Sequence, residues 1–150
     1  MAMVIKIQKL RPEAVLPHYA HPGDVGLDLY SVDSGVVAPG ERKLFYCGFA
    51  LEFPDGYAAI VKDRGSMAGK GLHTLGGVFD AGFRGEYNVM LYNVGDKPYE
   101  VHAGDKIAQL VIVPVEIATL EEVTELSDSS RGKGQFGSTG HAIHDSLKPL

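Results

Sequence analysis

The chain has 150 residues, enough for one domain, and its single cysteine rules out an intramolecular disulfide framework. A net charge of −5 argues against general binding to nucleic-acid phosphates, and no apolar run approaches the roughly 20 residues of a membrane helix. The N-terminal MAMVIKIQKL lacks the layout of a signal peptide, so we expect a cytoplasmic protein with neither nucleic acid nor membrane as a partner.

Short apolar or alternating runs follow one another along the chain, separated by Gly, Pro, Asp and Asn. In one of these runs Tyr87, Val89 and Leu91 share a face, as the period of a strand requires. The only helical pattern is a short turn around residues 66–68. Such a sequence predicts an all-β fold of short strands, a β-sandwich or jelly roll. The expected strands are residues 4–10, 25–31, 43–53, 57–61, 86–94, 98–101 and 106–115.

The composition changes from about residue 127, where SDSSRGKGQFGSTG is polar and glycine-rich. Such a segment cannot pack a core of its own. It predicts a flexible C-terminal arm over residues 127–150, after a β domain over residues 1–126. A passive tail is the simplest interpretation, but the lone aromatic Phe136 has no neighbours to bury it and is expected to contact something else.

The segment GGVFDAGFRGE predicts a β-hairpin with Asp80 near its tip. Asp beside Gly is often only a turn former. The flanking glycines, however, let the backbone approach a ligand closely, and its N–H and C=O groups could read the edge of a base. The hairpin is therefore a candidate binding element.

Three further segments carry candidate polar groups. In DRGSMAGKG, Arg64 precedes a helical turn whose N-terminus favours phosphate, although Arg64 could be a surface charge and Ser66 an ordinary N-cap. Asp28 stands between two leucines, and an acid in such a place is either paired or near a metal. Gln109 lies within an apolar strand, where it is either functional or an edge-strand residue facing water.

Taken together, five segments resemble in order the five motifs of the trimeric dUTPase family, over about residues 20–140. They are AHPGDVGLDLYS, DRGSMAGKG, GGVFDAGFRGEYNV, GDKIAQLVIVPV and RGKGQFGSTG. The resemblance implies a distorted jelly roll that forms a homotrimer. Each active site would collect residues from three subunits, and the C-terminal arm would cover a neighbour's site. The implied reaction is Mg²⁺-dependent hydrolysis of dUTP to dUMP and pyrophosphate.

The resemblance also implies roles for individual residues. Asp80 would be the general base that activates water for attack on the α-phosphorus, and Asp28 would contact Mg²⁺ through a metal-bound water. Phe83 would pack against the sugar and reject a ribose hydroxyl. The remaining groups would bind the phosphates (Arg64, Gly65, Ser66, Gln109, Arg131, Ser138 and Thr139) or the uracil ring (Gly77, Val78 and Phe136).

The chain departs from the family pattern in motif two, where Gly65 stands in place of the usual serine. Either Ser66 or the Gly65 N–H would replace that contact, or catalysis would be weaker. Phe83 stands where tyrosine is commoner. A weakly active or non-catalytic regulatory trimer is therefore an alternative. A dCTP deaminase is less favoured, because that family needs a Glu at the position of Met90, whose thioether cannot move protons.

Overall fold

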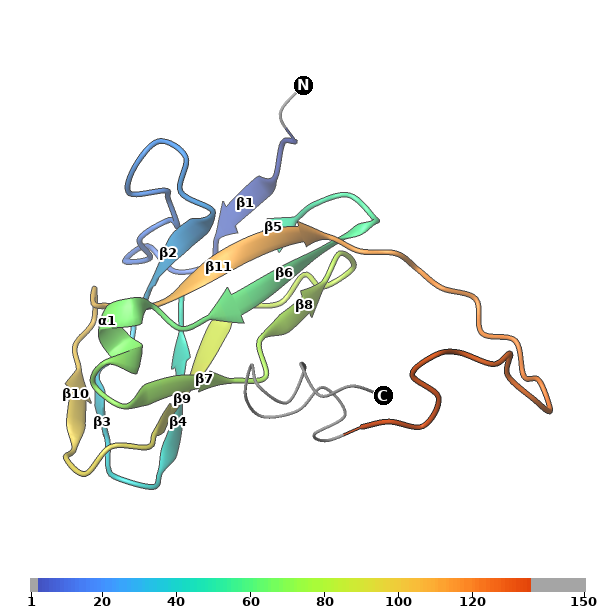
Figure 1. Ribbon diagram of the computed structural model, residues 1–150. Coiled ribbons are helices and arrows are strands. Elements are labelled where there is room, and N and C mark those ends of the chain that lie inside the picture. The colour runs from blue at the N-terminus through green and yellow to red at the C-terminus, as the bar shows by residue number, and fades with distance from the viewer. Residues whose placement is uncertain (1–2, 136–150) are drawn as a thin grey trace. The chain divides into compact units, whose positions relative to one another are not determined.

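The structure, a computed structural model, describes residues 3–135. The chain divides into two units, residues 1–117 and residues 118–150. The first unit contains every strand and the single short helix of the described residues (Figure 1). These elements are β1 Lys6–Lys9, β2 Gly26–Tyr30, β3 Gly35–Val37, β4 Arg42–Tyr46, β5 Phe49–Glu52, β6 Tyr57–Lys62, α1 Gly65–Ala68, β7 Leu72–Leu75, β8 Val78–Asp80, β9 Asn88–Asn93, β10 Tyr99–Val101 and β11 Lys106–Pro114.

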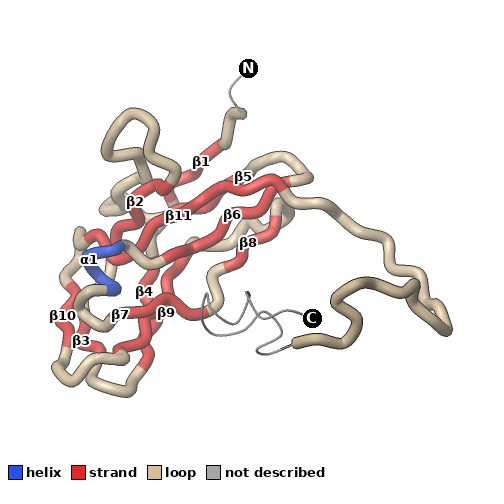
Figure 2. Tube along the Cα trace, in the orientation of Figure 1, coloured by secondary structure: helices blue, strands red, loops and turns tan. Residues whose placement is uncertain are grey.

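The strands form small antiparallel sheets, which confirms the predicted all-β class (Figure 2). The largest sheet has the order β2-β11-β6-β8, and a second has the order β4-β9-β7. Two further pairs join β1 to β5 and β10 to β3. Strand β11 is central, since it pairs with β2 on one side and β6 on the other. This arrangement of short strands is that of a jelly roll.

The expected strand over residues 43–53 is wrong as a single element, because it divides into β4 and β5. The break falls at Gly48, which has a φ of +76°. A side chain there would be strained, and its Cβ would come within 2.6 Å of Ala14 Cβ. The expectation also omitted β3, β7 and β8, each only three or four residues long.

The core lies between the sheets and follows the period of the strands. Along β9 the alternate residues Val89, Leu91 and Asn93 are buried, and Tyr87 just before them is fully buried. The Asn93 amide is satisfied, because it donates to the carbonyl oxygens of Val37 and Lys97 over 2.8 Å each. The shared face predicted from the sequence is thus the core face.

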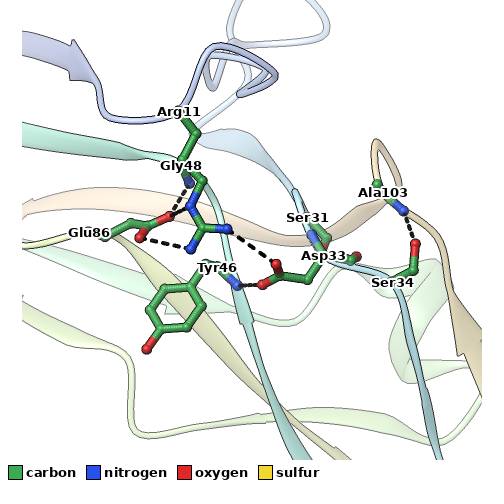
Figure 3. Close-up of polar contacts among 8 residues, drawn as sticks. All are labelled: Arg11, Ser31, Asp33, Ser34, Tyr46, Gly48, Glu86 and Ala103. Atoms are coloured by element: carbon green, nitrogen blue, oxygen red, sulfur yellow. Dashed lines mark hydrogen bonds and ion pairs between the residues drawn. The ribbon is translucent and has the colours of Figure 1, made fainter.

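A polar network fixes the start of β9 to the N-terminal segment (Figure 3). The Arg11 guanidinium binds both carboxylate oxygens of Glu86, at 2.8 and 3.1 Å, and reaches Asp33 Oδ1 at 3.3 Å. Glu86 also accepts a hydrogen bond from the Gly48 amide over 3.0 Å. These contacts anchor Glu86, the last residue of the segment GGVFDAGFRGE.

Helix α1 has four residues. Over the part of the chain that is described, no helix is long and apolar enough to cross a membrane.

Candidate active site

Five of the predicted site residues line one pocket of about 580 Å³. Asp28 comes from β2, Gln109 from β11, and Arg64, Gly65 and Ser66 from the start of α1. The pocket therefore joins three of the five segments singled out in the sequence, AHPGDVGLDLYS, DRGSMAGKG and GDKIAQLVIVPV. Its other lining residues are Ala20, His21, Asp24, Val25, Gly26 and Lys106.

Sheet register explains why these distant segments meet. Gln109 on β11 lies opposite Asp28 on β2 and opposite Lys62 at the end of β6. The chain leaves β6 at Lys62 and enters α1 at Gly65. The residues between them thus begin next to Gln109, and Arg64 comes within reach of Asp28.

Asp28 is buried, with 8% of its surface exposed, and it contacts two cations. Arg64 Nε lies 3.0 Å from Oδ1, and Lys106 Nζ lies 2.8 Å from Oδ2. Burial opposes the charged carboxylate, but the contacts with Lys106 and Arg64 together outweigh it and hold the pKa of Asp28 below its ordinary value. The carboxylate is therefore ionised at neutral pH.

Lys106 was missed by the sequence interpretation, although it lies within the segment GDKIAQLVIVPV. In a regular strand, residues 106 and 109 would point to opposite faces, because their separation is odd. The pairing of β11 with β2 shifts register between Lys106 and Ala108, and such a bulge re-aims side chains. Both Lys106 and Gln109 consequently line the pocket. No local pattern in the sequence predicts this shift in register.

The Gln109 side chain is held in one orientation. Its Nε2 donates to the Asp63 carbonyl oxygen over 2.8 Å, which excludes the interpretation of Gln109 as a free edge-strand residue. Its Oε1 lies over Gly26, where a Cβ would come within 2.0 Å. A side chain at residue 26 would displace this amide, and the second Nε2 hydrogen remains for a ligand.

Asp63 is a second residue that the sequence interpretation missed. Its Oδ1 accepts hydrogen bonds from the Thr74 amide and hydroxyl, each at 2.6 Å, and its Oδ2 lies 2.7 Å from His73 Nδ1. Burial opposes its charge, but the bonds from Thr74 and His73 prevail and lower the pKa of Asp63. The residue ties β7 to both Arg64, its neighbour, and Gln109.

The start of α1 has open space at the departure from the family pattern. Arg64 is the N-cap residue, and no side chain caps the helix, so the interpretation of Ser66 as an N-cap is wrong. A Cβ at Gly65 would meet no atom within 4 Å. The pocket thus has room beside Gly65 for a ligand or for a larger side chain.

A second group of predicted residues lies on and around β8, the strand that pairs with β6 at the edge of the largest sheet. Gly77 has a φ of +84°, and its carbonyl oxygen accepts the Val61 amide over 2.7 Å. Val78 and Asp80 are exposed on β8, and the Phe83 amide donates to the Asp80 carbonyl oxygen over 3.0 Å. The hairpin predicted from the sequence is wrong as a pair of adjacent strands, because β8 pairs with β6 and β9 pairs with β4 and β7. Residues 76–86, the β8 segment, nevertheless place Asp80 and Phe83 in one turn.

Within one chain, Asp80 is far from the pocket lined by Asp28, Arg64 and Gln109. Asp80 lies opposite Ala58 on β6, four residues from Lys62, the β6 residue in line with Asp28. Three strand spacings and four residues amount to roughly 14 Å across the sheet and 13 Å along it, or about 19 Å in all. In Figure 1 the end of β8 points away from α1. The structure therefore brings together two sets of predicted residues, not one.

Of the predicted arm residues, only Arg131 lies within the described part of the chain. It is exposed, and its Nε donates to the Gly134 carbonyl oxygen over 3.0 Å. The other predicted arm residues, Phe136, Ser138 and Thr139, lie outside the described residues.

Comparison with known proteins bears on what this arrangement does. A sequence model of the dUTPase family matches residues 12–140. A deoxyuridine 5'-triphosphate nucleotidohydrolase of Thermobifida fusca is 49% identical over 140 residues, covering 91% of this chain and 78% of that protein.

Solved structures give the same likeness. A mutant dUTPase of Staphylococcus bacteriophage 80alpha, with dUpNHpp, matches with a TM-score of 0.87 and 27% identity, covering 92% of this chain and 99% of that one. A mutant dUTPase from phage phi11 of S. aureus matches with a TM-score of 0.78 and 25% identity, covering 83% and 99%. That structure is described as revealing the coordination of a structural Mg(II) ion.

Proposed function

The chain belongs to the dUTPase family, and from this premise we propose that it hydrolyses dUTP to dUMP and pyrophosphate. The reaction lowers dUTP and supplies the precursor of dTMP. The observation that carries the proposal is the convergence of Asp28, Arg64 and Gln109, from three separate segments, on one pocket. This pocket offers two cations to phosphate oxygens and one carboxylate to a hydrated cation.

We assign the triphosphate to this pocket. Arg64 supplies a planar guanidinium that suits phosphate oxygens, and Gln109 has one amide hydrogen left to donate. Ser66 adds a hydroxyl, and Gly65 adds a main-chain N–H in place of the family's serine. These groups stabilise the negative charge that moves onto the leaving pyrophosphate.

Asp80 is the general base in this proposal. Its carboxylate takes a proton from water, the water oxygen bonds to the α-phosphorus, and the bond from that phosphorus to the bridging oxygen breaks, releasing pyrophosphate. A general base must lie about 2.6–3.2 Å from the proton carrier it serves. The exposed position of Asp80 at the end of β8 leaves it free to face a substrate.

The separation of about 19 Å between Asp80 and Asp28 supports a shared active site. A base that far from the phosphate pocket of its own chain cannot act on a substrate held there. We therefore propose a homotrimer in which the β8 segment of one subunit, residues 76–86, completes the pocket of another. The dUTP bound in each site then touches more than one chain.

The pocket fits a hydrated Mg²⁺. Asp28 lines the pocket, and Arg64 and Lys106 keep its carboxylate charged, so it is the group that would accept a hydrogen bond from a metal-bound water. Residues 3–135 contain no group of three or more His, Cys, Asp or Glu placed to hold a metal alone. Mg²⁺ commonly keeps its waters and is held largely by substrate phosphates, whose charge it neutralises when bound.

The β8 segment contacts the nucleoside in this proposal. Phe83 packs against C2′ of the sugar, and the backbone at Gly77 and Val78 contacts the uracil edge and leaves no room for the 5-methyl group of thymine. The left-handed φ of Gly77 and its contact with β6 fix this backbone, since a Cβ there would come within 2.8 Å of Val61 Cβ.

The arm completes the site in this proposal. Residues 127–150 act as an arm separate from the β domain of residues 1–126, and they close over a neighbouring subunit. Arg131, Ser138 and Thr139 bind phosphates, and Phe136 stacks on uracil, a contact worth roughly 1–3 kcal/mol.

One experiment tests the function: pyrophosphate release from dUTP, dCTP, dTTP and UTP measured in parallel with Mg²⁺. We expect dUTP to be hydrolysed and the other three to be much poorer substrates. Ammonia release from dCTP would identify a deaminase instead. Binding of dUTP without turnover, equal in the wild type and in Asp80→Asn, would identify the regulatory trimer.

A further inference from the structure

We propose that Tyr87 is a positioning residue that sets the discrimination between deoxyribose and ribose, by holding the ring of Phe83 in place. The inference rests on the proposed function, in which Phe83 packs against the sugar. Tyr87 itself is fully buried and so does not touch substrate. Tyr87 acts through the aromatic rings that lie between the core and the β8 segment.

Three aromatic rings, those of Phe49, Tyr87 and Phe79, form a continuous stack, and Phe83 of the β8 segment lies against its end. Phe49 and Tyr87 stack with centroids 5.2 Å apart, and Tyr87 and Phe79 stack at 4.3 Å. Phe83 then contacts Phe79 at 5.3 Å and the edge of Tyr87 at 5.9 Å. The partly exposed ring of Phe83 thus rests on two rings, and Tyr87 touches every other member of the stack.

The backbone at Tyr87 is fixed on both sides. Its amide donates to the Phe49 carbonyl oxygen over 2.8 Å, and its carbonyl oxygen accepts the Cys47 amide over 2.9 Å. The preceding residue, Glu86, is held by two hydrogen-bonded contacts with Arg11 (Figure 3). A ring on this backbone is a firm support for Phe83.

Gly85 confines the Phe83 ring from another direction. A Cβ at Gly85 would come within 2.5 Å of Phe83 Cζ and 2.8 Å of Cε2. The ring therefore lies against the Gly85 backbone. Gly85 has no positive φ, so alanine fits its backbone and would act by displacing the ring.

The shape of the Tyr87 ring matters here, and its hydroxyl does not. Tyr87 Oη is buried and has no hydrogen-bond partner among the described residues. Burial raises the pKa of this hydroxyl to about 12, so it stays neutral. Phenylalanine at this position would keep the support, whereas leucine would remove the ring that Phe79 and Phe83 both contact.

Support of this kind determines specificity because the two sugars differ by one hydroxyl. A pocket rejects the larger sugar only if its wall is held in place. One added group in an apolar site changes kcat/KM by about 10–200-fold. A Phe83 ring that is free to move by about 1 Å would admit the 2′-hydroxyl of UTP. The ratio of kcat/KM for dUTP to that for UTP therefore reports the position of this ring.

The test compares Tyr87→Leu with Tyr87→Phe as the matched control. We expect Tyr87→Leu to lower the dUTP/UTP ratio of kcat/KM by about tenfold, and Tyr87→Phe to leave it within about twofold. Loss of stability alone reduces the amount of active enzyme and leaves the ratio unchanged. A folded Tyr87→Leu enzyme with the wild-type ratio would overturn the inference.

Gly85→Ala provides a second measurement if Tyr87→Leu does not fold. It displaces the same ring without touching the core, and we expect a changed dUTP/UTP ratio with a thermal midpoint near that of the wild type. An unchanged ratio in a folded Gly85→Ala enzyme would contradict the inference. Failure of the wild-type chain to hydrolyse dUTP would instead contradict the proposed function, so the two failures are distinguishable.

Discussion

The main-chain amide of Phe83 donates a hydrogen bond of 3.0 Å to the carbonyl oxygen of Asp80. One turn therefore carries both the proposed general base and the ring proposed to pack against the sugar. The Arg84 guanidinium adds to this turn, because it donates to the carbonyl oxygens of Ala81 and Phe83 at 2.6 and 3.0 Å. The residue proposed to select the sugar and the residue proposed to activate water thus share one hydrogen-bonded turn.

Asp80→Asn should lower kcat steeply and change the affinity for dUTP little. Asparagine has nearly the same shape but cannot take a proton, and general-base catalysis contributes typically 10²–10⁴-fold. Steady-state kinetics together with binding of a non-hydrolysable dUTP analogue separate the two effects. A variant with wild-type kcat would show that another group, or none, activates the water.

Gly65→Ser should raise kcat/KM several-fold. A Cβ at Gly65 meets no atom within 4 Å, so serine fits without displacing a neighbour. The added hydroxyl would restore the family's phosphate contact, and a neutral hydrogen bond is worth about 0.5–1.5 kcal/mol net. Gly65→Ala is the control, since it adds the Cβ without the hydroxyl. A fall in kcat/KM for Gly65→Ser alone would show that Ser66 or the Gly65 amide already fills this place.

The stability of the fold should depend on the charge of Asp28. Its pKa is lower in the folded chain than in the unfolded one, so its stabilising effect is complete above the ordinary Asp value of about 4 and is lost as pH falls through the folded pKa. Asp28→Asn should therefore be less stable than the wild type at pH 7, with a difference that shrinks below about pH 4.

Urea unfolding of both proteins between pH 7 and pH 3 measures this effect. The exposed turn residue Asp55 provides the control, because Asp55→Asn should lose little stability at any of these pH values. An Asp28→Asn variant that parallels the wild type over the whole range would contradict the prediction. Such a result would mean that the ion pairs of Asp28 with Arg64 and Lys106 add nothing to the stability of the fold.

The sequence predicted much of the pocket because its residues lie in local motifs on strands that turn out to be neighbours. Asp28 and Gln109 are directly opposed in the β2–β11 register, and Arg64 follows the strand that pairs on the other side of β11. Short apolar runs broken by turn residues are also sufficient to predict an all-β fold. These features depend on local pattern, which one sequence displays.

Features that depend on long-range pairing were not predictable in the same way. The bulge that turns Lys106 into the pocket is a property of two paired strands, and the role of Gly48 depends on the nearby Ala14. The distance between Asp80 and Asp28 follows from the strand order β2-β11-β6-β8. Periodicity within a segment contains no information about that order.

Tyr87→Phe should make the folded chain more stable. The Tyr87 hydroxyl is buried and has no hydrogen-bond partner in residues 3–135, and a buried unsatisfied group costs about 1–3 kcal/mol. Phenylalanine removes that group and keeps the ring stack with Phe49 and Phe79. The free energy of unfolding in urea should rise by about 1 kcal/mol. A clear fall would show that the hydroxyl has a partner in the assembled protein.

Truncation after Ser130 should leave a folded protein that hydrolyses dUTP poorly. Within the described residues, the strands and the core all lie in residues 1–117, and residues 118–135 are exposed, so we expect the β domain to fold without the segment removed. The truncation deletes Arg131 and Phe136, and the loss of base stacking alone, roughly 1–3 kcal/mol, lowers kcat/KM by about one to two orders of magnitude.

The single substitution Phe136→Ala should produce part of that loss, because it removes the stacking face and keeps Arg131 to bind phosphate. Lys133→Ala is the matched control, since it changes a neighbouring arm residue to which no contact is assigned. Pyrophosphate release and the thermal midpoint, measured together for all three variants, separate catalysis from folding. Unchanged kcat/KM after truncation would show that the segment is a passive tail, the simplest interpretation of its composition.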